Sequence, residues 1–524
     1  MFYFIPAWYP KERPWYDGTA PWFRVFERMS FDDTVNQLKM FQNAAEASCL
    51  VLLNYQPQLR YFLHKQDLLD TPYWSFFDDI QTVSRVSTHP LSFKELNWPR
   101  GTRFLYSPFA VVAQKGDETL ATIHFAENGN LFTIDWQKEG HLDKQYVFDD
   151  RGFISSILYH NDMGQPLYQD YLNPNGVWQV REHLGVEKRG IEVNGYADGR
   201  FDKRWYVTWE ELLQERLGVL KREVITAEDV LVLASHAHHN DLLLESFPEQ
   251  QKVVSFFADR YDTTRCDLLA PLAQAATLLV VDTKQQEHQL LTSLEELGSS
   301  SHPVSRISPF DTRLRLGHSQ MVKELILYFH IDGLLEEEVK AILSDLLILM
   351  DQEALVELRL VTFQHQYPLA GLKEWVEQEI SRSFELAHFF QVVEGTGENE
   401  LEEEEELELT RIRFDCFSNE SQVIEALDTA RLVLDLGPEP DLYTQIASIS
   451  AGIPQIHRVE TEYVTHLKNG WVLGEGGSLL EALHYYLDGL ANWNAALVYA
   501  VQKMADYTSG RILSQWKDLL EQES

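Results

Sequence analysis

The chain has 524 residues, too many for a single hydrophobic core, so two or more domains are expected. Its 44 Lys and Arg against 81 Asp and Glu give a formal net charge of −37, which argues against nucleic-acid binding and against broad adhesion to anionic lipid. Three dispersed cysteines, Cys49, Cys266 and Cys416, predict neither a zinc site nor a disulfide framework and fit a reducing compartment.

The N-terminal segment MFYFIPAWYPKERPW is apolar for only a few residues and lacks the basic start of a signal peptide. No apolar run approaches the ~18 residues that a membrane-spanning helix needs. We therefore expect a soluble cytosolic protein.

The first hundred residues have the rhythm of an α/β domain. Residues 2–5 are predicted as a strand, residues 31–47 as a helix with Ser30 as its N-cap, and residues 49–55 as a buried strand. Short apolar runs that alternate with helical patterns favour a parallel sheet covered by helices.

Residues 101–210 change to closely spaced strands and turns. Two alternating runs flank Asn128-Gly129, which is the strongest short hairpin signal. Regular spacing of this kind predicts an antiparallel β-meander inserted into the α/β domain. Further turns are predicted at 149–152, 162–164 and 173–176, and further strands at 153–159 and 177–182.

The α/β rhythm resumes after this insertion. Buried strands are predicted at 229–234, 252–257 and 276–281. Ser and Pro then become frequent at 299–309, which indicates a domain boundary.

From about residue 320, strands and helices alternate cleanly, which predicts a second parallel sheet covered on both faces. Its strands are expected at 325–329, 355–363, 411–417 and 431–436. Its helices are expected at 335–349, 372–380, 422–429, 442–450 and 479–487.

Residues 398–409, ENELEEEEELEL, form a run of negative charge. Because like charges repel one another, such a run favours a solvated loop or hairpin. A specific docking site for a basic partner is the alternative.

Residues 437–475 resemble the nucleotide-sugar half of the retaining GT-B glycosyltransferases. In that family a Glu follows a strand, a second Glu lies eight residues later, and a G-x-P motif and an N-G turn follow. Here Glu439 takes the first place, Gly452-Ile453-Pro454 matches G-x-P, and Asn469-Gly470 supplies the later turn.

The chain departs from this family at the residues that hold the donor. The second Glu falls on Ala447, which has no acceptor for the donor ribose. The family also places an Arg and a Lys after the first strand of this domain, where they neutralise the diphosphate leaving group. Phe329 and His330 stand near the expected Arg, and the expected Lys region, 332–338, is acidic.

Loss of these cations makes sugar transfer unfavourable. One lost donor of this kind raises the barrier by about 3 kcal/mol. The helix after Pro440 offers an N-terminal dipole, but Glu439 and Asp441 lie at the same end and would repel a phosphate. We therefore expect weak or no turnover of a nucleotide sugar.

A histidine-rich segment, Ser235-His236-Ala237-His238-His239, follows a predicted strand. The carboxyl ends of strands are where open α/β sheets bind ligands. His236 and His238 fit hydrogen bonding to a sugar, a metal pair, or a polar loop that caps the next helix.

Aromatic residues are dense near the N-terminus. Flat rings of this kind stack on sugars, pack in cores or partner interfaces, or contact a membrane surface, and all three readings stay open. The residues are Trp8, Tyr9, Trp15, Tyr16, Trp22 and Phe23.

The β-rich segment resembles the insertion of the glycosyltransferases that modify serine-rich-repeat adhesins in streptococci. Asp150-Arg151-Gly152-Phe153, Tyr171-Leu172-Asn173, Gly176 and Trp178 carry this likeness. With the altered donor site, the whole chain resembles the first of the accessory Sec-system Asp proteins. These are cytosolic partners of the accessory SecA motor and are needed to export the same adhesins.

Together these features predict an α/β, GT-B-like architecture of two Rossmann-like domains, with an antiparallel β-meander inserted in the first. The first domain is expected at 1–100 and 211–312, the insertion at 101–210 and the second domain at 313–490. The helices of 491–524 are expected to pack back on the first domain, as in similar proteins.

The resemblance implies a non-catalytic glycosyltransferase homologue, without cofactor or metal, that binds O-glycosylated adhesin precursor. Its expected partners are that precursor, other accessory secretion proteins and the accessory SecA motor, in the cytoplasm or peripherally at the inner face of the plasma membrane. Two alternatives stay open: an active retaining glycosyltransferase that uses a UDP-sugar to modify a protein, and a structural scaffold without sugar binding. The expected glycan contacts are Trp15, Tyr16, His236, His238, Glu439, Asn469 and Gly470.

Overall fold

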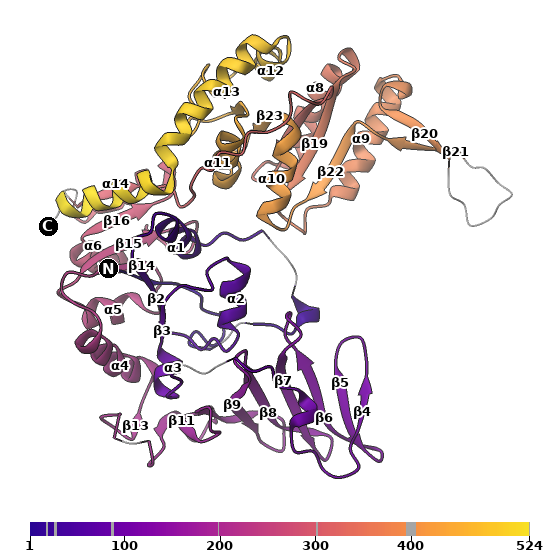
Figure 1. Ribbon diagram of the computed structural model, residues 1–524. Helices are drawn as coiled ribbons and strands as arrows, with labels where there is room; N and C mark the ends of the chain where they lie inside the picture. The colour runs from indigo at the N-terminus through magenta and orange to yellow at the C-terminus, as the bar shows by residue number, and fades with distance from the viewer. Residues whose placement is uncertain are drawn as a thin grey trace. The chain divides into compact units, whose positions relative to one another are not determined.

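The computed structural model describes residues 1–16, 19–25, 29–84, 88–197, 199–299, 302–394 and 405–522. The chain forms two compact units (Figure 1). Unit 1 comprises Met1–Phe26, Asp32–Ile307 and Leu519–Ser524, and unit 2 comprises Glu27–Phe31 and Ser308–Asp518.

Unit 1 contains a parallel sheet with the strand order β17-β16-β15-β14-β1-β2-β3. Its central strands are buried along their whole length, as expected for a sheet that is covered on both faces. The strands are β1 (Phe2–Ile5), β2 (Ser48–Leu52), β3 (Tyr73–Ser75), β14 (Val230–Ala234), β15 (Gln251–Phe256), β16 (Leu278–Val281) and β17 (Val304–Arg306). The helices of this unit are α1 (Asp33–Asn43), α2 (Leu59–Lys65), α3 (Phe76–Ile80), α4 (Trp209–Glu223), α5 (Asn240–Ser246), α6 (Cys266–Ala275) and α7 (Lys284–Glu296).

Helix α1 is shorter than the sequence predicted. The expected N-cap was Ser30, but the side chain of Asp32 caps the helix by accepting a hydrogen bond from the backbone N–H of Val35 at 2.9 Å. The helix ends at Asn43, and Ala45 has a φ of 55°, which is incompatible with a continuing right-handed helix. The expected span of 31–47 was therefore too long at both ends.

Residues 103–206 add an antiparallel sheet to unit 1, with the order β13-β12-β11-β10-β9-β8-β7-β6-β5-β4 (Figure 1). The predicted hairpin at Asn128-Gly129 is present between β6 and β7, and Gly129 has a φ of 81°. The strands are β4 (Arg103–Tyr106), β5 (Val111–Lys115), β6 (Glu118–Phe125), β7 (Leu131–Lys138), β8 (His141–Asp149), β9 (Phe153–His160), β10 (Pro166–Leu172), β11 (Trp178–His183), β12 (Gly190–Val193) and β13 (Trp205–Tyr206).

Unit 2 contains a second parallel sheet, in the order β22-β19-β18-β23-β24-β25. Apolar side chains fill both of its faces: one core includes residues of α8, α9 and α12, and the other includes residues of α10 and α11. The strands are β18 (Leu325–His330), β19 (Val356–Thr362), β22 (Ile412–Cys416), β23 (Ala430–Asp435), β24 (Gln455–His457) and β25 (Gly470–Val472). The helices are α8 (Glu336–Gln352), α9 (Leu369–Ser383), α10 (Glu420–Thr429), α11 (Leu442–Ala451), α12 (Leu479–Leu487), α13 (Leu490–Met504) and α14 (Ser509–Gln522).

The acidic run is only partly described. Its residues 398–404 lie outside the described residues, whereas the last part forms strand β21 (Glu405–Leu409). That strand pairs with β20 (Phe390–Glu394) in an antiparallel hairpin.

Helix α13 forms the first part of the terminal residues 491–524. It belongs to unit 2, where the indole N–H of Trp493 donates a hydrogen bond of 2.7 Å to the backbone carbonyl of Arg431 in β23. Trp493 is 2% exposed, so this helix is anchored by a fully buried side chain. Only the final residues from Leu519, at the end of α14, belong to unit 1.

Candidate functional site

The carboxyl ends of β18 and β23 form the centre of the candidate site in unit 2. The chain runs outward from β18 to β19 and β22 on one side, and to β23, β24 and β25 on the other. Such a reversal of strand order is where open α/β sheets bind ligands. The last residues of the two central strands, His330 and Asp435, are direct neighbours across the sheet.

His330 lies between two carboxylates. Its Nδ1 is 3.1 Å from Oδ2 of Asp435, and its Nε2 is 3.3 Å from Oδ2 of Asp332. Burial lowers the pKa of His330, but the charge of Asp435 and hydrogen bonds to both carboxylates outweigh burial and raise the pKa well above its ordinary value. The imidazole is therefore protonated at neutral pH, and its charge is neutralised within the protein.

The N-terminus of α11 is closed by the chain's own carboxylates. The side chain of Asp441 accepts a hydrogen bond of 2.7 Å from the backbone N–H of Thr444, and the N–H of Asp441 donates to Oδ2 of Asp435 at 2.8 Å. Backbone N–H groups at a helix N-terminus are what would hold a phosphate. Two of them are already bonded to carboxylates, so the arrangement disfavours an anion.

The remaining motif residues lie around this helix. Glu439 is exposed in the loop between β23 and α11. Ala447 is half-buried on α11 and packs against an apolar cluster, where it presents no acceptor. Gly452 ends α11 with a φ of 73°, so the glycine of the G-x-P motif is required by the turn that leads to β24.

Asn469 and Gly470, two of the expected glycan contacts, are buried. The side-chain amide of Asn469 donates to the carbonyl of Tyr463 at 2.8 Å and accepts from the N–H of Thr465 at 2.8 Å. A Cβ atom on Gly470 would lie 2.2 Å from the carbonyl oxygen of Gln455. Both residues therefore shape the turn into β25, and neither presents a polar group to a ligand.

The histidine-rich segment of unit 1 surrounds the ring of Tyr9. His236 and His238 have ring centroids 4.9 Å and 5.9 Å from that ring, and the hydroxyl of Tyr9 is 2.7 Å from Nδ1 of His239. Nε2 of His239 lies 2.8 Å from the carbonyl of Ala234 and must be the donor there. Because burial lowers the pKa of His239 to about 3, the ring is neutral and its Nδ1 accepts from Tyr9.

The two expected ligand histidines differ in exposure. His236 is half-buried, and burial lowers its pKa to about 4, so it is neutral at physiological pH. Its Nδ1 accepts a hydrogen bond of 3.2 Å from the backbone N–H of His238. His238 is exposed, so it is the member of this cluster that is open to a ligand.

The two expected aromatic contacts lie in different surroundings. Trp15 joins the histidine cluster, with its ring 5.4 Å from that of Tyr9, but it is 5% exposed and its N–H donates to Glu210 at 2.8 Å. Tyr16 turns toward the β-meander, where its hydroxyl accepts a hydrogen bond of 3.1 Å from the amide of Gln169. Trp15 therefore supports the cluster from within the core.

Sequence reasoning missed the carboxylate of Asp435 and the buried ring of His457, which are paired across β23 and β24. His457 is fully buried, and among the described residues neither of its ring nitrogens has a hydrogen-bond partner. A polar residue that ends a largely apolar strand was the available signal for Asp435.

The described part of the chain has neither a cluster of metal ligands nor a membrane-spanning helix. No group of three or more His, Cys, Asp or Glu residues is placed to hold a metal ion there. None of the helices that the structure describes combines the length and the apolar character needed to cross a bilayer.

Comparison with known proteins assigns the family. The family model of the first accessory Sec system protein of the Asp family matches residues 1–523. The chain belongs to this family. A relative from Streptococcus gordonii with the same description is 36% identical over 532 residues, which cover 100% of this chain and 99% of the relative.

Two solved structures contain chains that are similar over the full length. A chain of the "Glycosylation Associate Protein (Gap123) complex from Streptococcus agalactiae" is 35% identical, has a TM-score of 0.78, and is matched over 99% of this chain and 100% of that chain. A chain of the crystal structure of accessory secretory proteins 1, 2 and 3 of Streptococcus pneumoniae is 33% identical with a TM-score of 0.79, over 100% of this chain and 99% of that chain.

The fold is that of the GT-B glycosyltransferases. The pneumococcal O-GlcNAc transferase GtfA, solved with UDP and GlcNAc, has a TM-score of 0.68 over 100% of this chain and 98% of that chain. The two sequences are only 12% identical, so this likeness concerns the fold alone. The predicted architecture and the predicted family are both confirmed.

Proposed function

We propose that this protein is a non-catalytic glycosyltransferase homologue that binds O-glycosylated serine-rich-repeat adhesin precursor and helps its export. It acts in the cytoplasm, in a complex with the other accessory secretion proteins, and passes the precursor to the accessory SecA motor. The family assignment and the complexes named for its relatives support the place in secretion.

The contact between His330 and Asp435 is the observation that carries the non-catalytic part of the proposal. Transfer from a sugar diphosphate requires fixed cations that stabilise the charge of the leaving group. The cation between the ends of the two central strands, His330, is already paired with Asp435 and Asp332. An incoming diphosphate would meet carboxylates at the position where the chemistry needs positive charge.

Calorimetry with UDP-GlcNAc tests the absence of donor chemistry. We expect no heat of binding at ligand concentrations up to the millimolar range and no release of UDP in the presence of adhesin precursor. Binding together with turnover, lost in Glu439→Ala, would establish the alternative of an active transferase.

The precursor-binding part needs a separate titration. The assembled complex should bind GlcNAc-modified precursor more tightly than the unmodified precursor, and His238→Ala should reduce that difference. Equal affinity for the two forms would contradict glycan recognition and favour a scaffold without sugar binding. Glu374→Ala, an exposed substitution on α9, is the matched control and should leave both affinities unchanged.

A further inference from the structure

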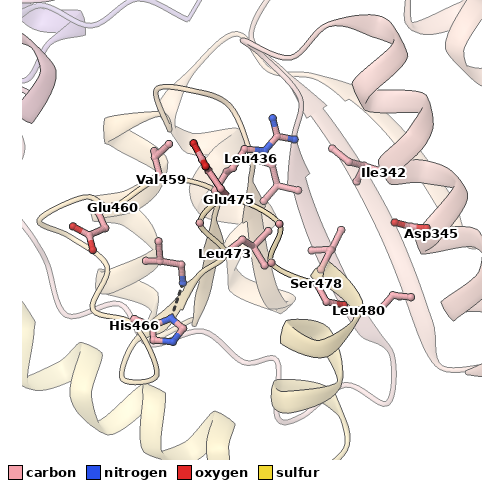
Figure 2. A pocket seen from close by; sticks show the side chains of 16 residues that line it. Ile342, Asp345, Leu436, Val459, Glu460, His466, Leu473, Glu475, Ser478 and Leu480 are labelled. Carbon is pink, nitrogen blue, oxygen red and sulfur yellow. Dashed lines mark hydrogen bonds between the residues drawn. The ribbon is translucent and has the colours of Figure 1, made fainter.

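A hollow of about 970 Å³ lies in unit 2 beside the carboxyl ends of β24 and β25 (Figure 2). Helix α8 forms one wall, and the segments that follow the two strands, together with the start of α12, form the others. Its lining includes neither His330 nor Asp435. The hollow therefore adjoins the strand-end cluster described above, through Leu436 and Arg458, without including its ion pair.

The floor of the hollow is aliphatic. Ile342 of α8 and Leu436 at the end of β23 supply its buried part, and Leu473 and Leu480 also line it (Figure 2). Within the lining, the side chains at these positions offer no hydrogen-bonding group. A ligand that fills the hollow must therefore bring apolar side chains of its own.

The glycine-rich loop 474–477 keeps one wall free of bulky side chains. Gly474 and Gly476 have φ angles of 64° and 77°, where other residues are strained. A Cβ atom on Gly477 would lie 2.2 Å from the carbonyl oxygen of Leu473. The backbone geometry thus holds the loop in a tight turn and leaves the floor accessible.

The rim of the hollow is acidic. Asp345, Glu460 and Glu475 stand around it, and Figure 2 shows them on different walls. The basic side chain of the lining, Arg458, is 2.8 Å from Glu338 and is neutralised by it. In the part of the chain that the structure describes, Asp345 and Glu475 have no basic group within 4.0 Å.

A second hollow, of about 440 Å³, lies along α12 and is also lined by apolar and acidic side chains. Glu481 and Asp488 contribute carboxylates to its lining, that of Asp488 lying 3.0 Å from Nδ1 of His484, and Trp471 and Tyr485 contribute rings that lie 5.3 Å apart. Apolar side chains and carboxylates therefore line one hollow at the start of α12 and another along the rest of that helix. A surface of this length suits a peptide segment better than a small molecule.

We propose that these hollows form a docking site for a basic amphipathic segment of a partner protein. The segment places aliphatic side chains on Ile342 and Leu473 and sets Lys or Arg side chains against Asp345 and Glu475. Charge complementarity selects this occupant, because a nucleotide, an acidic peptide or an anionic lipid would face the same carboxylates unfavourably. The inference rests on the proposed function, in which the partner is another accessory secretion protein.

Charge reversal at the rim tests the docking site. Asp345→Lys combined with Glu475→Lys should weaken association with the other two accessory secretion proteins about tenfold or more, measured by sedimentation or calorimetry. The control, Glu374→Lys with Glu425→Lys, makes the same change of charge at exposed positions on α9 and α10 and should retain wild-type affinity. Equal weakening in both variants, or none in the rim variant, overturns the proposal.

A photo-crosslinking residue at Glu475 identifies the occupant. In the assembled complex it should capture a partner segment in which Lys or Arg flanks aliphatic residues. Capture of a second copy of this chain or of an acidic segment, or no capture in an intact complex, overturns the assignment. If the unsubstituted chain forms no complex, the proposed function fails as well, which distinguishes that outcome from a failure of this surface alone.

Discussion

Nδ1 of His330 lies 3.1 Å from Oδ2 of Asp435, at the adjoining ends of the two central strands of unit 2. Asp435 also accepts from the N–H of Asp441, so the same carboxylate oxygen joins the strand ends to the start of α11. His330 is 4% exposed and Asp435 is 1% exposed. A buried ion pair of this kind holds together three segments that are distant in sequence.

Removal of the imidazole should therefore destabilise unit 2. His330→Ala leaves Asp435 and Asp332 without their cation, and breaking a buried pair in this way costs about 3–5 kcal/mol of the free energy of unfolding. Urea unfolding of the purified wild-type and variant chains measures this loss in the free energy of unfolding. His318→Ala removes an exposed imidazole that lies 2.8 Å from Asp428 and should cost less than about 1 kcal/mol. Similar losses in the two variants would contradict the role of burial.

The same pair predicts a pH window. The folded-state pKa of His330 is raised, so its stabilising contribution is complete below the ordinary value of 6.5 and is lost as the pH rises through the folded value. Burial raises the pKa of Asp332, but its interactions with His330 outweigh burial and lower it, so its contribution is complete above 3.8 and is lost as the pH falls through the folded value. The difference in unfolding free energy between wild type and His330→Ala should be largest between pH 3.8 and 6.5. A difference that stays constant from pH 3 to pH 9 would rule this linkage out.

The elements of unit 2 were predictable because each has a local signature. Apolar runs at 325–329 and 431–436 match β18 and β23 to within one residue, and the helix predicted at 479–487 coincides with α12. Strands buried on both faces give continuous apolar runs, and helices that cover them show helical spacing. The G-x-P spacing at Gly452 made the GT-B fold predictable. That glycine has a structural role, because a residue in the left-handed region is needed where α11 ends.

The chemistry of the site was less predictable, because it depends on contacts across long sequence separations. His330 was recognised only as a replacement for a lost cation, whereas its pairing with Asp435 joins residues 105 positions apart. The sequence suggested that Asn469 is an exposed turn residue, but its side-chain amide forms hydrogen bonds within a buried loop. A sequence pattern reveals secondary structure through its periodicity, but it does not show which polar side chains are buried or which of them pair with one another.

Two glycines near the docking site should respond differently to alanine. Gly470→Ala places a Cβ 2.2 Å from the carbonyl of Gln455 and forces β24 and β25 apart, at a cost of about 2–3 kcal/mol. Gly476→Ala meets no atom within 4 Å and carries only the strain of a φ of 77°, about 1 kcal/mol. Thermal unfolding of both variants measures the difference. Equal costs would show that the strand spacing adapts to the added methyl group.

Two neighbouring histidines should separate stability from recognition in unit 1. His239→Ala removes both the contact with Tyr9 and the hydrogen bond to Ala234, and should lower the free energy of unfolding by about 2 kcal/mol because it leaves a buried carbonyl unpaired. His238→Ala, at an exposed position, should change stability by less than about 0.5 kcal/mol. If His238→Ala nevertheless weakens binding of glycosylated precursor, the effect comes from recognition, because the fold is intact. A loss of stability in His238→Ala as large as that in His239→Ala would remove this distinction and assign the segment a purely structural role.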